Sequence, residues 1–383
     1  MMTKLAVAAI FKNELPYIME WVAYHQLIGV DRIIVADNVS DDGSSGLLEA
    51  LSEAGIIERL HFPRLGDAPP QPLAYNAILK KYGSEFDLIA FIDADEFIMA
   101  ESADENPIDI LKALYQQQPD LGAIALNWRV YGSSRQYYEG TGLVLERFSC
   151  CADEDFPINN HIKSVVVPDK VAEMIVHYAQ LKSGVYYTAT GHKASFAQED
   201  VSGKSLTVGV CHQKIILNHY ITKSYREHYN RKYLKGSAAG EIGRRKGQEY
   251  FNGHDRSDEY RPVSAGLLIA VREHISLLHA RLHSCSPYYS NIRGHIDAIY
   301  PAVVGWVSSN NLHVKVKVLI DRKIELIAEM TVSRPDVVDA GISVFECCGF
   351  EIDLPEGVNA ETPIEVSVYG TNLRLYPAPE WVS

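Results

Sequence analysis

Three carboxylates follow an apolar run in the segment Phe91-Ile-Asp-Ala-Asp-Glu-Phe97. The run over residues 87–92 has the composition of a buried strand, and in an open α/β domain the residues beyond a strand's carboxyl end line the ligand crevice. Asp93 and Asp95 alternate with Ala94, so on an extended backbone both carboxylates would point to one side. Such oxygen ligands suit a divalent cation, which could bridge the two phosphates of a nucleotide.

Segments with strand and helix character alternate around these acids. The expected strands, which are short apolar runs, cover residues 5–11, 32–37, 56–62, 88–92, 123–130 and 214–220. The expected helices cover residues 15–28, begin after Ser44 and after Pro72, and run from Pro107 to just before Pro119. This alternation is typical of a parallel sheet with crossover helices.

The region after residue 130 loses this regular alternation. Residues 131–168 form a loop-rich stretch, and a stretch this long in a compact domain usually carries function. Ser224 and Glu227 have the spacing of a reciprocal helix cap, which predicts a helix over about 225–234. Apolar residues at helical spacing predict a further helix over 265–282, which could link two domains.

Short alternating runs replace the helical pattern beyond Tyr289. Valines at 314, 316 and 318 alternate with lysines, and Gly, Pro and Asn residues bound the runs. Such alternation is typical of a small antiparallel β-sandwich. We therefore predict an α/β domain over residues 1–262, a helical linker over 263–290 and a β-sandwich over 291–383.

The composition is that of an ordinary globular protein. The chain has 383 residues, of which 47% are apolar and 22% are charged, and this length allows two domains. A formal net charge of -13 argues against nucleic-acid binding, because contacts with a phosphate backbone need clustered Lys and Arg. Eight Lys or Arg residues between 223 and 246 nevertheless form a local positive face.

The cysteines and the apolar runs give no sign of secretion. The six cysteines include the adjacent pairs Cys150/Cys151 and Cys347/Cys348 and lack metal-type spacing, so we read them as reduced thiols. The first apolar run is too short for a signal peptide and leads directly into Lys12. No apolar stretch approaches the length of a membrane span. We therefore expect a cytoplasmic protein.

An ordered set of short motifs resembles a known family. The motifs are Phe11-Lys-Asn-Glu-Leu-Pro-Tyr17, Glu20-Trp21, Tyr24-His25, Asp37-Asn38, Asp41-Asp-Gly-Ser44, Tyr75-Asn76, Phe91-Ile-Asp-Ala-Asp-Glu-Phe97, Glu146-Arg147, Ile162-Lys163-Ser164 and Asn218-His219-Tyr220. Together, over about residues 5 to 240, they resemble a GT-A-fold glycosyltransferase of the bacterial family-2-like group related to glycosyltransferase family 92. The C-terminal part resembles a sandwich appended to bacterial glycosyltransferases, through segments such as Gly305-Trp306-Val307 and Arg334-Pro-Asp336.

The resemblance implies a nucleotide-sugar donor, which we expect to be a UDP-hexose. The implied donor-binding residues are Phe11, Asn13, Glu14, Asp37, Asn38, Asn76, Asp93, Ala94, Lys163 and Lys223. Asp and Asn suit this role because they can bond the amide edge of uracil or the ribose hydroxyls. Residues 37–44 are also good turn formers, so a turn and a binding role can coexist there. Gln71 could orient the same region.

The resemblance also implies a metal cofactor, Mn²⁺ or Mg²⁺, with Asp93, Asp95 and His219 as ligands. Neutral imidazole binds Mn²⁺ readily. The alternative for His219 is a satisfied histidine near a strand end. Glu96 would either support the ligands or contact the sugar.

An inverting transfer needs a carboxylate within hydrogen-bond reach of the acceptor hydroxyl. Glu146 is our first candidate for this catalytic base, because it falls in the region after the acidic strand where such transferases place it, and Asp155 is a rival. Glu146 could instead be a structural partner of Arg147. Lys163 and Lys223 are candidates to stabilise the charge of the leaving diphosphate.

The acceptor-binding residues are the part of the site that the family resemblance predicts least well. Trp128 and Tyr131 could stack on an acceptor sugar, although buried aromatics are the commoner case. Arg135 follows Ser133 and Ser134 where the family often has Gly. We expect a saccharide or glycolipid acceptor in surface polysaccharide or lipopolysaccharide assembly, with galactose favoured as the hexose by resemblance. A glycolipid acceptor would bring peripheral contact with a membrane surface.

Two other classes compete with this interpretation. A haloacid-dehalogenase-type phosphatase also uses Asp-x-Asp after a strand, but it expects the motif on the first strand, whereas here the motif follows the fourth. A glycan-binding protein with an inactive transferase domain is the second alternative, against which the intact Asp93, Asp95 and His219 argue. The sequence gives no prediction of the oligomeric state.

Overall fold

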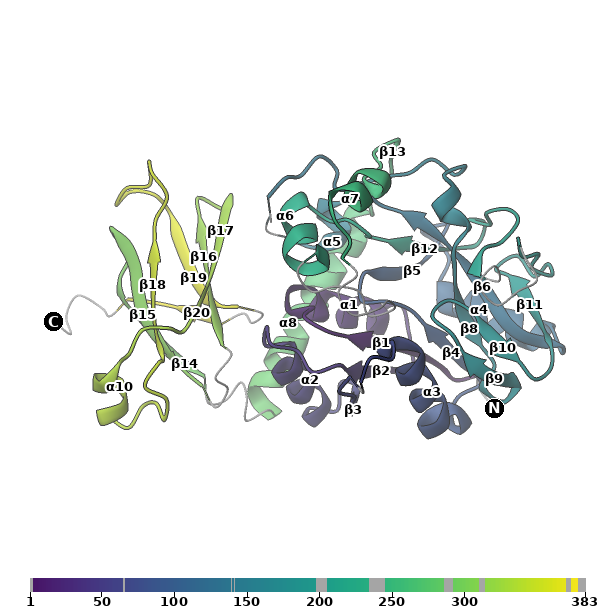
Figure 1. The fold of residues 1–383 in the computed structure, drawn as a ribbon, viewed down its shortest axis with the longest axis horizontal. Coiled ribbons are helices and arrows are strands. Elements are labelled where there is room, and N and C mark those ends of the chain that lie inside the picture. Colours follow the sequence, from purple (N-terminus) through teal and green to yellow (C-terminus); the bar gives the residue numbers. More distant parts are fainter. Residues whose placement is uncertain are drawn as a thin grey trace.

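The chain folds into an α/β domain followed by a β-sandwich, shown on the right and left of Figure 1. The computed structural model describes residues 3–64, 66–138, 140, 142–197, 205–233, 245–285, 292–309, 314–369 and 373–377. The predicted class, an α/β domain with a small antiparallel sandwich after it, is confirmed. No helix among these residues combines the length and the apolar character that crossing a membrane requires.

A mixed sheet forms the centre of the α/β domain. Its strands are β1 (Leu5–Phe11), β2 (Arg32–Asp37), β3 (Glu58–His61), β4 (Leu88–Phe91), β5 (Glu96–Ala100), β6 (Leu121–Val130), β8 (Ile162–Val166), β11 (Val185–Thr188) and β12 (Ile215–His219). The spatial order is β3-β2-β1-β4-β8-β6-β12-β5, and β11 pairs with β6. Two small pairs flank it: β7 (Cys150–Cys151) with β13 (Glu259–Tyr260), and β9 (Val171–Met174) with β10 (Ala179–Leu181).

The sheet is parallel only in part, so the prediction of a parallel sheet is wrong for its second half. Strands β1 to β4 pair in parallel, as predicted. Strand β8 is antiparallel to both β4 and β6, and β5 is antiparallel to β12. A parallel return needs a crossover connection, usually a helix. Among the described residues between β6 and β8, the helical elements are only a four-residue helix, α5 (Val144–Arg147), and a single 3-10 turn.

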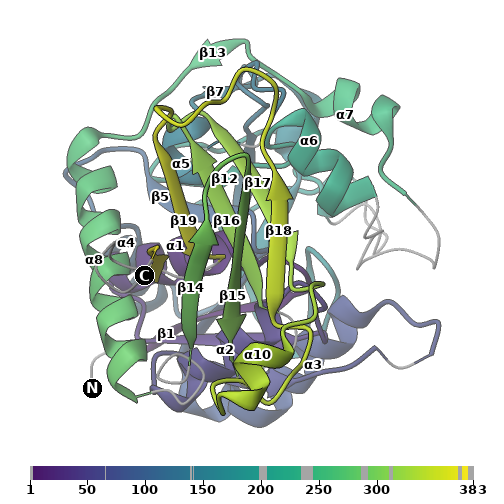
Figure 2. The ribbon, with the colours of Figure 1, turned by 90° about the vertical axis from the view of Figure 1, so that its left-hand side faces the viewer.

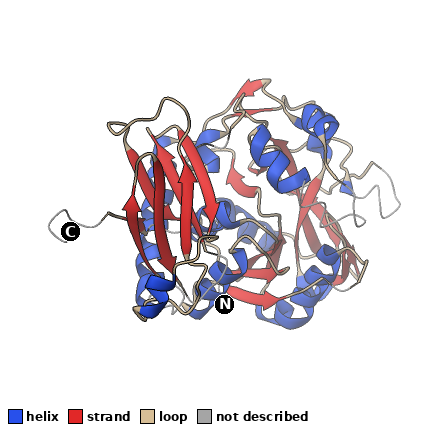
Figure 3. Cartoon of the chain, turned by 60° about the vertical axis from the view of Figure 1, so that its left-hand side comes forward, coloured by secondary structure: helices blue, strands red, loops and turns tan. Residues whose placement is uncertain are grey.

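Helices cover both faces of this sheet (Figure 3). The longer ones are α1 (Leu15–Leu27), α2 (Ser44–Glu53), α3 (Pro70–Tyr82), α4 (Pro107–Gln117) and α8 (Ala265–Cys285), and the shorter ones besides α5 are α6 (Tyr225–Glu227) and α7 (Gln248–His254). Residues of α1, α2, α4 and α8 share one buried core, and those of α3 share a second core on the other face. The sheet is thus buried on both sides, as parallel strands require.

Two helical predictions need refinement. The reciprocal cap of Ser224 and Glu227 is present, but α6 is a single turn and continues as a π-helical segment over His228–Tyr233. The predicted end at Leu234 lies outside the described residues. The predicted linker helix, α8, packs on α1 and α2 and contributes Val271 and Leu278 to the α/β core, so it is no free-standing connection.

The sandwich consists of two antiparallel sheets. Its elements are β14 (Arg293–Ala298), β15 (Ala302–Ser308), β16 (Lys315–Ile320), β17 (Ile324–Glu329), α10 (Pro335–Asp339), β18 (Gly349–Asp353), β19 (Ile364–Val368) and β20 (Arg374–Leu375). One sheet has the order β14-β15-β18 and the other β17-β16-β19-β20. Val314, Val316 and Val318 are buried between them, as their alternation with lysines predicts. The predicted boundary at residues 290 and 291 lies outside the described residues.

Candidate functional site

The loop between β4 and β5 carries the three carboxylates and bends sharply. Ala94 and Asp95 form a turn, so the predicted extended alternation of Asp93 and Asp95 is wrong. The bend is needed because the chain must reverse after β4 for β5 to pair with β12. Trp21 of α1 holds both ends of the turn, since its indole N–H lies 3.2 Å from the carbonyl oxygen of Asp93 and 3.0 Å from that of Glu96.

Asp93 is bound by three donors that lie below the turn. Its Oδ1 accepts hydrogen bonds from Lys163 Nζ (2.8 Å), Gln71 Nε2 (2.6 Å) and Tyr75 Oη (3.1 Å). Lys163 reaches it because β8 runs antiparallel to β4, which places the start of β8 beside the end of β4. Burial would raise the pKa of Asp93, but the charge of the buried Lys163 lowers it, and that pairing in turn raises the pKa of Lys163.

Asp95 faces two other partners. Its Oδ2 accepts a hydrogen bond of 2.6 Å from Lys232 Nζ, in the π-helical segment. Its Oδ1 lies 3.4 Å from His219 Nε2. His219 is positioned by the pairing of β12 with β5, which sets it opposite Glu96. Burial would raise the pKa of Asp95, but the charges of Lys232 and His219 lower it well below its usual range.

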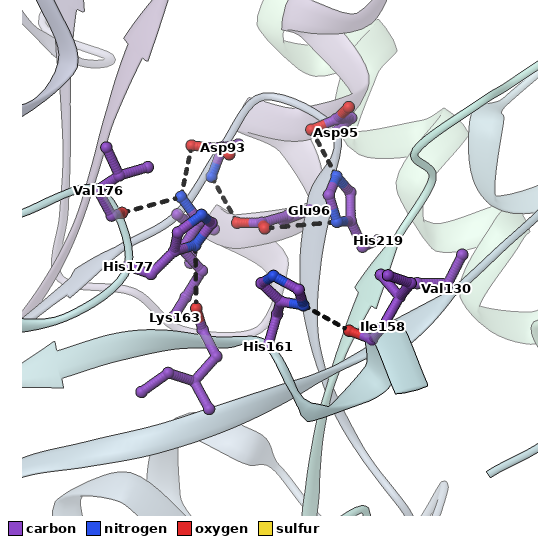
Figure 4. Close-up of polar contacts among 12 residues, drawn as sticks. Asp93, Asp95, Glu96, Val130, Ile158, His161, Lys163, Val176, His177 and His219 are labelled. Atoms are coloured by element: carbon purple, nitrogen blue, oxygen red, sulfur yellow. Dashed lines mark hydrogen bonds and ion pairs between the residues drawn. The ribbon is translucent and has the colours of Figure 1, made fainter. Parts of the chain in front are cut away.

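Glu96 and His219 form a buried polar pair next to Asp95 (Figure 4). Glu96 Oε2 accepts the backbone N–H of Asp93 at 2.7 Å, and its Oε1 lies 3.8 Å from His219 Nδ1. Neither Glu96 Oε1 nor His219 Nδ1 has a hydrogen-bond partner among the described residues. Burial lowers the pKa of His219 to about 4, so its imidazole is neutral at pH 7. Burial raises the pKa of Glu96 well above its usual range.

The donor set of Asp95 and His219 fits a divalent cation. A neutral imidazole nitrogen lies beside a carboxylate oxygen, which are two ligand types that Mn²⁺ accepts. Glu96 stands behind the other ring nitrogen, where metal-binding histidines usually have a carboxylate or carbonyl partner. Asp93 is directed to Lys163 instead, and no group of three or more His, Cys, Asp or Glu side chains suited to a metal ion occurs in the described part of the chain. The structure therefore does not assemble the predicted ligand set of Asp93, Asp95 and His219.

Aromatic rings pack against His219 on the protein side of this site. Trp128 lies edge-on to His219, with centroids 4.3 Å apart, and stacks on His161 at 4.9 Å. Tyr131 is also buried and stacks on Tyr220 at 4.7 Å. Trp128 and Tyr131 thus pack within the protein and are not available to stack on an acceptor sugar. His161 is a contact that the sequence did not single out.

Lys223 lies at the site, as predicted. It has a positive φ of 55°, and its ammonium lies 4.2 Å from the centroid of the Tyr17 ring. Burial lowers the pKa of Lys223, while the charges of Asp95 and Glu14 act to raise it. Lys232 was missed by sequence reasoning, because it is one of many cations in the basic stretch and only the turn of the π-helical segment directs it to Asp95.

The end of β1 is tied to the loop after β2. Asn13 Oδ1 accepts the backbone N–H of Asp41 at 3.1 Å, and the backbone N–H of Glu14 donates to Ser44 Oγ at 2.9 Å. Phe11 is buried and packs edge-on against Trp21. Asn13 and Glu14 thus lie just beyond the carboxyl end of β1, whereas the side chain of Phe11 packs in the core.

Asp37 and Asn38 hold the loop after β2 by their side chains. Asp37 is fully buried and forms an ion pair of 2.8 Å with Arg59. Asn38 Nδ2 donates to the carbonyl oxygen of Phe62 at 2.9 Å. These contacts support the turn-forming interpretation of the segment and leave the backbone as the part that faces a ligand.

Asn76 has a structural position instead of the predicted donor-binding one. Its Nδ2 donates to the carbonyl oxygens of Pro72 and Met174, both at 2.8 Å, and its Oδ1 accepts the N–H of Met174 at 2.9 Å. The side chain therefore joins α3 to β9.

Neither candidate base has a contact with Asp95 among the described residues. Glu146 forms an ion pair with Arg272 of α8, and no contact between described residues joins it to Asp93 or Asp95. Asp155 is exposed in the loop that leads to the 3-10 turn Pro157–Asn160. The structure thus gives Glu146 a partner that the sequence did not suggest and leaves Asp155 open to solvent.

Arg147 and Glu227 form a buried bidentate ion pair that fixes α6. Arg147 Nη1 and Nη2 donate to the two carboxylate oxygens of Glu227 at 2.9 and 2.6 Å. Tyr17 and Ser224 also donate to this carboxylate. Burial would raise the pKa of Glu227, but the hydrogen bonds and charge of Arg147 lower it to about 2.

Comparison with known proteins connects the chain to one family. Residues 5–197 match the model described as Glycosyltransferase family 92. A glycosyltransferase family 92 protein of Arabidopsis thaliana is 26% identical over 192 residues, which cover 48% of this chain and 32% of that protein. The match therefore spans about a third of the length of this curated relative.

Solved structures with a related architecture overlap the chain only loosely. S. aureus TarS is similar with a TM-score of 0.30 and 13% identity, over 99% of this chain and 79% of that chain. The mannosyltransferase PcManGT from Pyrobaculum calidifontis, in complex with GDP-Man and Mn²⁺, is similar with a TM-score of 0.26 and 19% identity, over 34% of this chain and 36% of that chain. At these scores neither structure supports an argument about the site.

The ammonium of Lys232 occupies the space beside Asp95 that a cation would need. Lys232→Met removes that charge, so we expect Mn²⁺ to bind about tenfold more tightly, which corresponds to about 1.4 kcal/mol. Titration of free Mn²⁺ by electron paramagnetic resonance measures this, with Lys193→Met, at an exposed lysine, as the control. Equal or weaker Mn²⁺ binding by Lys232→Met would contradict the assignment.

The buried pair predicts a pH-dependent loss of stability. The folded pKa of Glu227 is about 2, below the usual 4.5, so the pair stabilises the fold above pH 4.5 and this contribution is lost as the pH falls from 4.5 toward 2. Arg147→Met leaves a buried unpaired carboxylate and should lower the free energy of unfolding at pH 7 by about 3–5 kcal/mol. Urea unfolding checks this. Arg261→Met, which breaks an exposed pair, should cost less than about 1 kcal/mol.

Proposed function

Because the chain belongs to glycosyltransferase family 92, we propose that it transfers a hexose from a UDP-sugar to a hydroxyl of a saccharide acceptor. The family match confirms the predicted resemblance and makes the chain a glycosyltransferase, which removes the phosphatase alternative. The observation that carries the proposal is the contact of the Asp95 carboxylate with the neutral His219 imidazole at the end of β4. Donor, acceptor and metal dependence are the proposed parts.

Asp95 and His219 are the residues that would hold Mn²⁺ or Mg²⁺. When bound there, the cation supplies positive charge to the diphosphate of the leaving nucleotide. Glu96 lies 3.8 Å from the other ring nitrogen of His219, on the side where a metal-binding histidine usually has a carboxylate partner. Asp93 acts differently, since it is the counter-ion that keeps the ammonium of Lys163 charged at the floor of the site.

The donor would lie across the carboxyl ends of β1 and β4. These strands are neighbours at the point where the strand order reverses, which is where open α/β sheets bind ligands. The backbone at Phe11 and Asp37 would contact the nucleoside, and the ammonium of Lys223 is close enough to Asp95 to affect its pKa. Positive charge held in place before the reaction stabilises the diphosphate as it departs.

We propose Asp155 as the catalytic base of an inverting transfer. A base must accept the proton of the acceptor hydroxyl as the oxygen attacks the anomeric carbon. The exposed carboxylate of Asp155 can meet an acceptor that arrives from solvent, whereas Glu146 is held by Arg272. Galactose as the hexose, surface polysaccharide or lipopolysaccharide as the product and the cytoplasm as the location are proposed from resemblance alone.

Removal of one metal ligand tests the central assignment. Asp95→Asn should reduce UDP release from UDP-hexoses in the presence of Mn²⁺ at least 100-fold, because a neutral amide is a poor ligand for a hard cation. Thermal unfolding shows whether the variant keeps its fold, because the amide keeps the size of the side chain but leaves Lys232 without its counter-charge. Asp104→Asn, at an exposed acid outside the site, is the control. Full activity of Asp95→Asn at limiting Mn²⁺ would refute the metal assignment.

A pair of variants tests the choice of base. Asp155→Asn should lower kcat at least 100-fold while the Kd for UDP stays the same, because only proton removal is lost. Glu146→Gln should change kcat less than about threefold. Steady-state kinetics with UDP-hexose and calorimetric binding of UDP measure both quantities. A large loss of kcat in Glu146→Gln with none in Asp155→Asn would reverse the assignment.

A further inference from the structure

A cleft of about 1060 Å³ lies between the α/β domain and the sandwich. On the α/β side it is lined by Lys12 and Asn13, which follow β1, and by Arg226 and Asn230 in and after α6. On the sandwich side it is lined by the hairpin of β16 and β17. Figures 1 and 2 show that the sheet with these two strands is the one that faces the α/β domain.

Apolar contacts hold the hairpin in this position. Ile327 of β17 and Tyr369, which follows β19, both pack with the core of the α/β domain. The charge of Glu325 acts on the buried Arg147 across the same junction. The sandwich is therefore docked on the α/β domain beside the cleft, and its hairpin forms a fixed wall.

The lining combines surfaces that suit a sugar ring. Tyr138 is 69% exposed and Ile324 is 44% exposed, so both present apolar surface to the cleft. Asn13, Asn230 and the exposed Asp41 add amide and carboxylate groups, which can bond hydroxyls as donors or acceptors. Aromatic faces beside such polar groups are suited to polyhydroxylated rings with apolar C–H faces.

Among the described residues that line the cleft, positive and negative charges are nearly balanced. The charged lining residues are Lys12, Arg226, Lys315, Lys323, Asp41, Asp42 and Glu325. Lys315 and Lys323 are also paired within the sandwich, with Glu329 at 3.0 Å and Asp321 at 2.6 Å. A diphosphate would instead match Lys223 and Lys232, which act on Asp95 and are not among the described lining residues. The cleft therefore matches an uncharged saccharide better than the nucleotide.

The cleft opens next to the metal-binding candidates. Asn230 stands two residues before Lys232, whose ammonium bonds Asp95. Asn13 precedes Glu14, whose charge acts on both Lys223 and Lys232. A saccharide in the cleft would thus have one end close to the place where the hexose is transferred.

We infer that this cleft binds the acceptor saccharide and that the β16–β17 hairpin contacts its sugar units beyond the reacting one. The assignment of the ligand as an acceptor rests on the proposed transferase function. The inference that a saccharide binds in the cleft rests only on the residues that line it. The sandwich then determines which acceptors are used, a role that its sequence resemblance does not assign.

Calorimetric titration with three neutral trisaccharides, maltotriose, cellotriose and chitotriose, tests this inference. We expect saturable binding of at least one of them to the full chain, with UDP and Mn²⁺ present as well as absent. Tyr138→Ala on one wall and Ile324→Ala on the other should each weaken that binding about fivefold, because each removes apolar contact with a ring. Tyr260→Ala, at a tyrosine that is 72% exposed outside the cleft, is the matched control.

Three results would overturn the inference. These are no binding of any of the three trisaccharides, equal binding by the wild type and both cleft variants, and displacement of the trisaccharide by UDP. Thermal unfolding of each variant shows whether the fold is kept. Hydrolysis of UDP-hexoses by the wild type is measured separately. If hydrolysis fails while trisaccharide binding depends on Tyr138 and Ile324, the cleft stands as a saccharide site and the transferase proposal falls.

Discussion

Burial of Asp95 and Glu96, and partial burial of Asp93, in one turn after β4 is the constraint on which the rest of the site depends. An uncompensated buried carboxylate is too costly to keep charged, so each of the three has its own solution. The charge of Asp93 is balanced by Lys163 and that of Asp95 by Lys232, whereas the raised pKa of Glu96 favours its neutral form. Antiparallel strand pairing brings Lys163 and His219 to this turn, because β8 starts beside the end of β4 and β12 ends beside Glu96.

Asp93 and Asp95 therefore have different roles in the site, although both belong to the same Asp-x-Asp motif. Asp93 belongs to the internal network of Lys163, Gln71 and Tyr75, which fixes the floor of the site. Asp95 contacts the neutral imidazole of His219 and the ammonium of Lys232, which lies on the π-helical segment. Asp95 is therefore the carboxylate that could exchange its ammonium partner for a metal ion. In the proposed function, Asp95 would lie where the diphosphate of the nucleotide leaves, and beside it the docked sandwich forms a wall of the cleft proposed for the acceptor.

Much of the fold follows from local pattern. Apolar runs predicted β1 to β4, β6 and β12, and Val alternation predicted the sandwich, because burial of one or two faces dictates these periods. Strands β5 and β8, which carry Glu96 and Lys163, were not predicted. The ordered motifs placed Asp95, His219, Lys163 and Lys223 at one edge, and the structure agrees. Strand direction, the turn at Ala94 and the reach of Lys232 were not predictable, since they depend on pairing between distant segments. The ion pair of Glu146 with Arg272 was not predictable for the same reason, because Arg272 lies far along the chain.

A crystal structure of the full chain with UDP and Mn²⁺, with anomalous scattering recorded for manganese, tests the central claim most directly. The account predicts an anomalous peak bonded to Asp95 and to His219 Nε2, with Lys232 moved away from the carboxylate and Asp93 still paired with Lys163. A bound nucleotide with no such peak and an unbroken contact between Lys232 and Asp95 would contradict it, as would manganese bound to Asp93 alone.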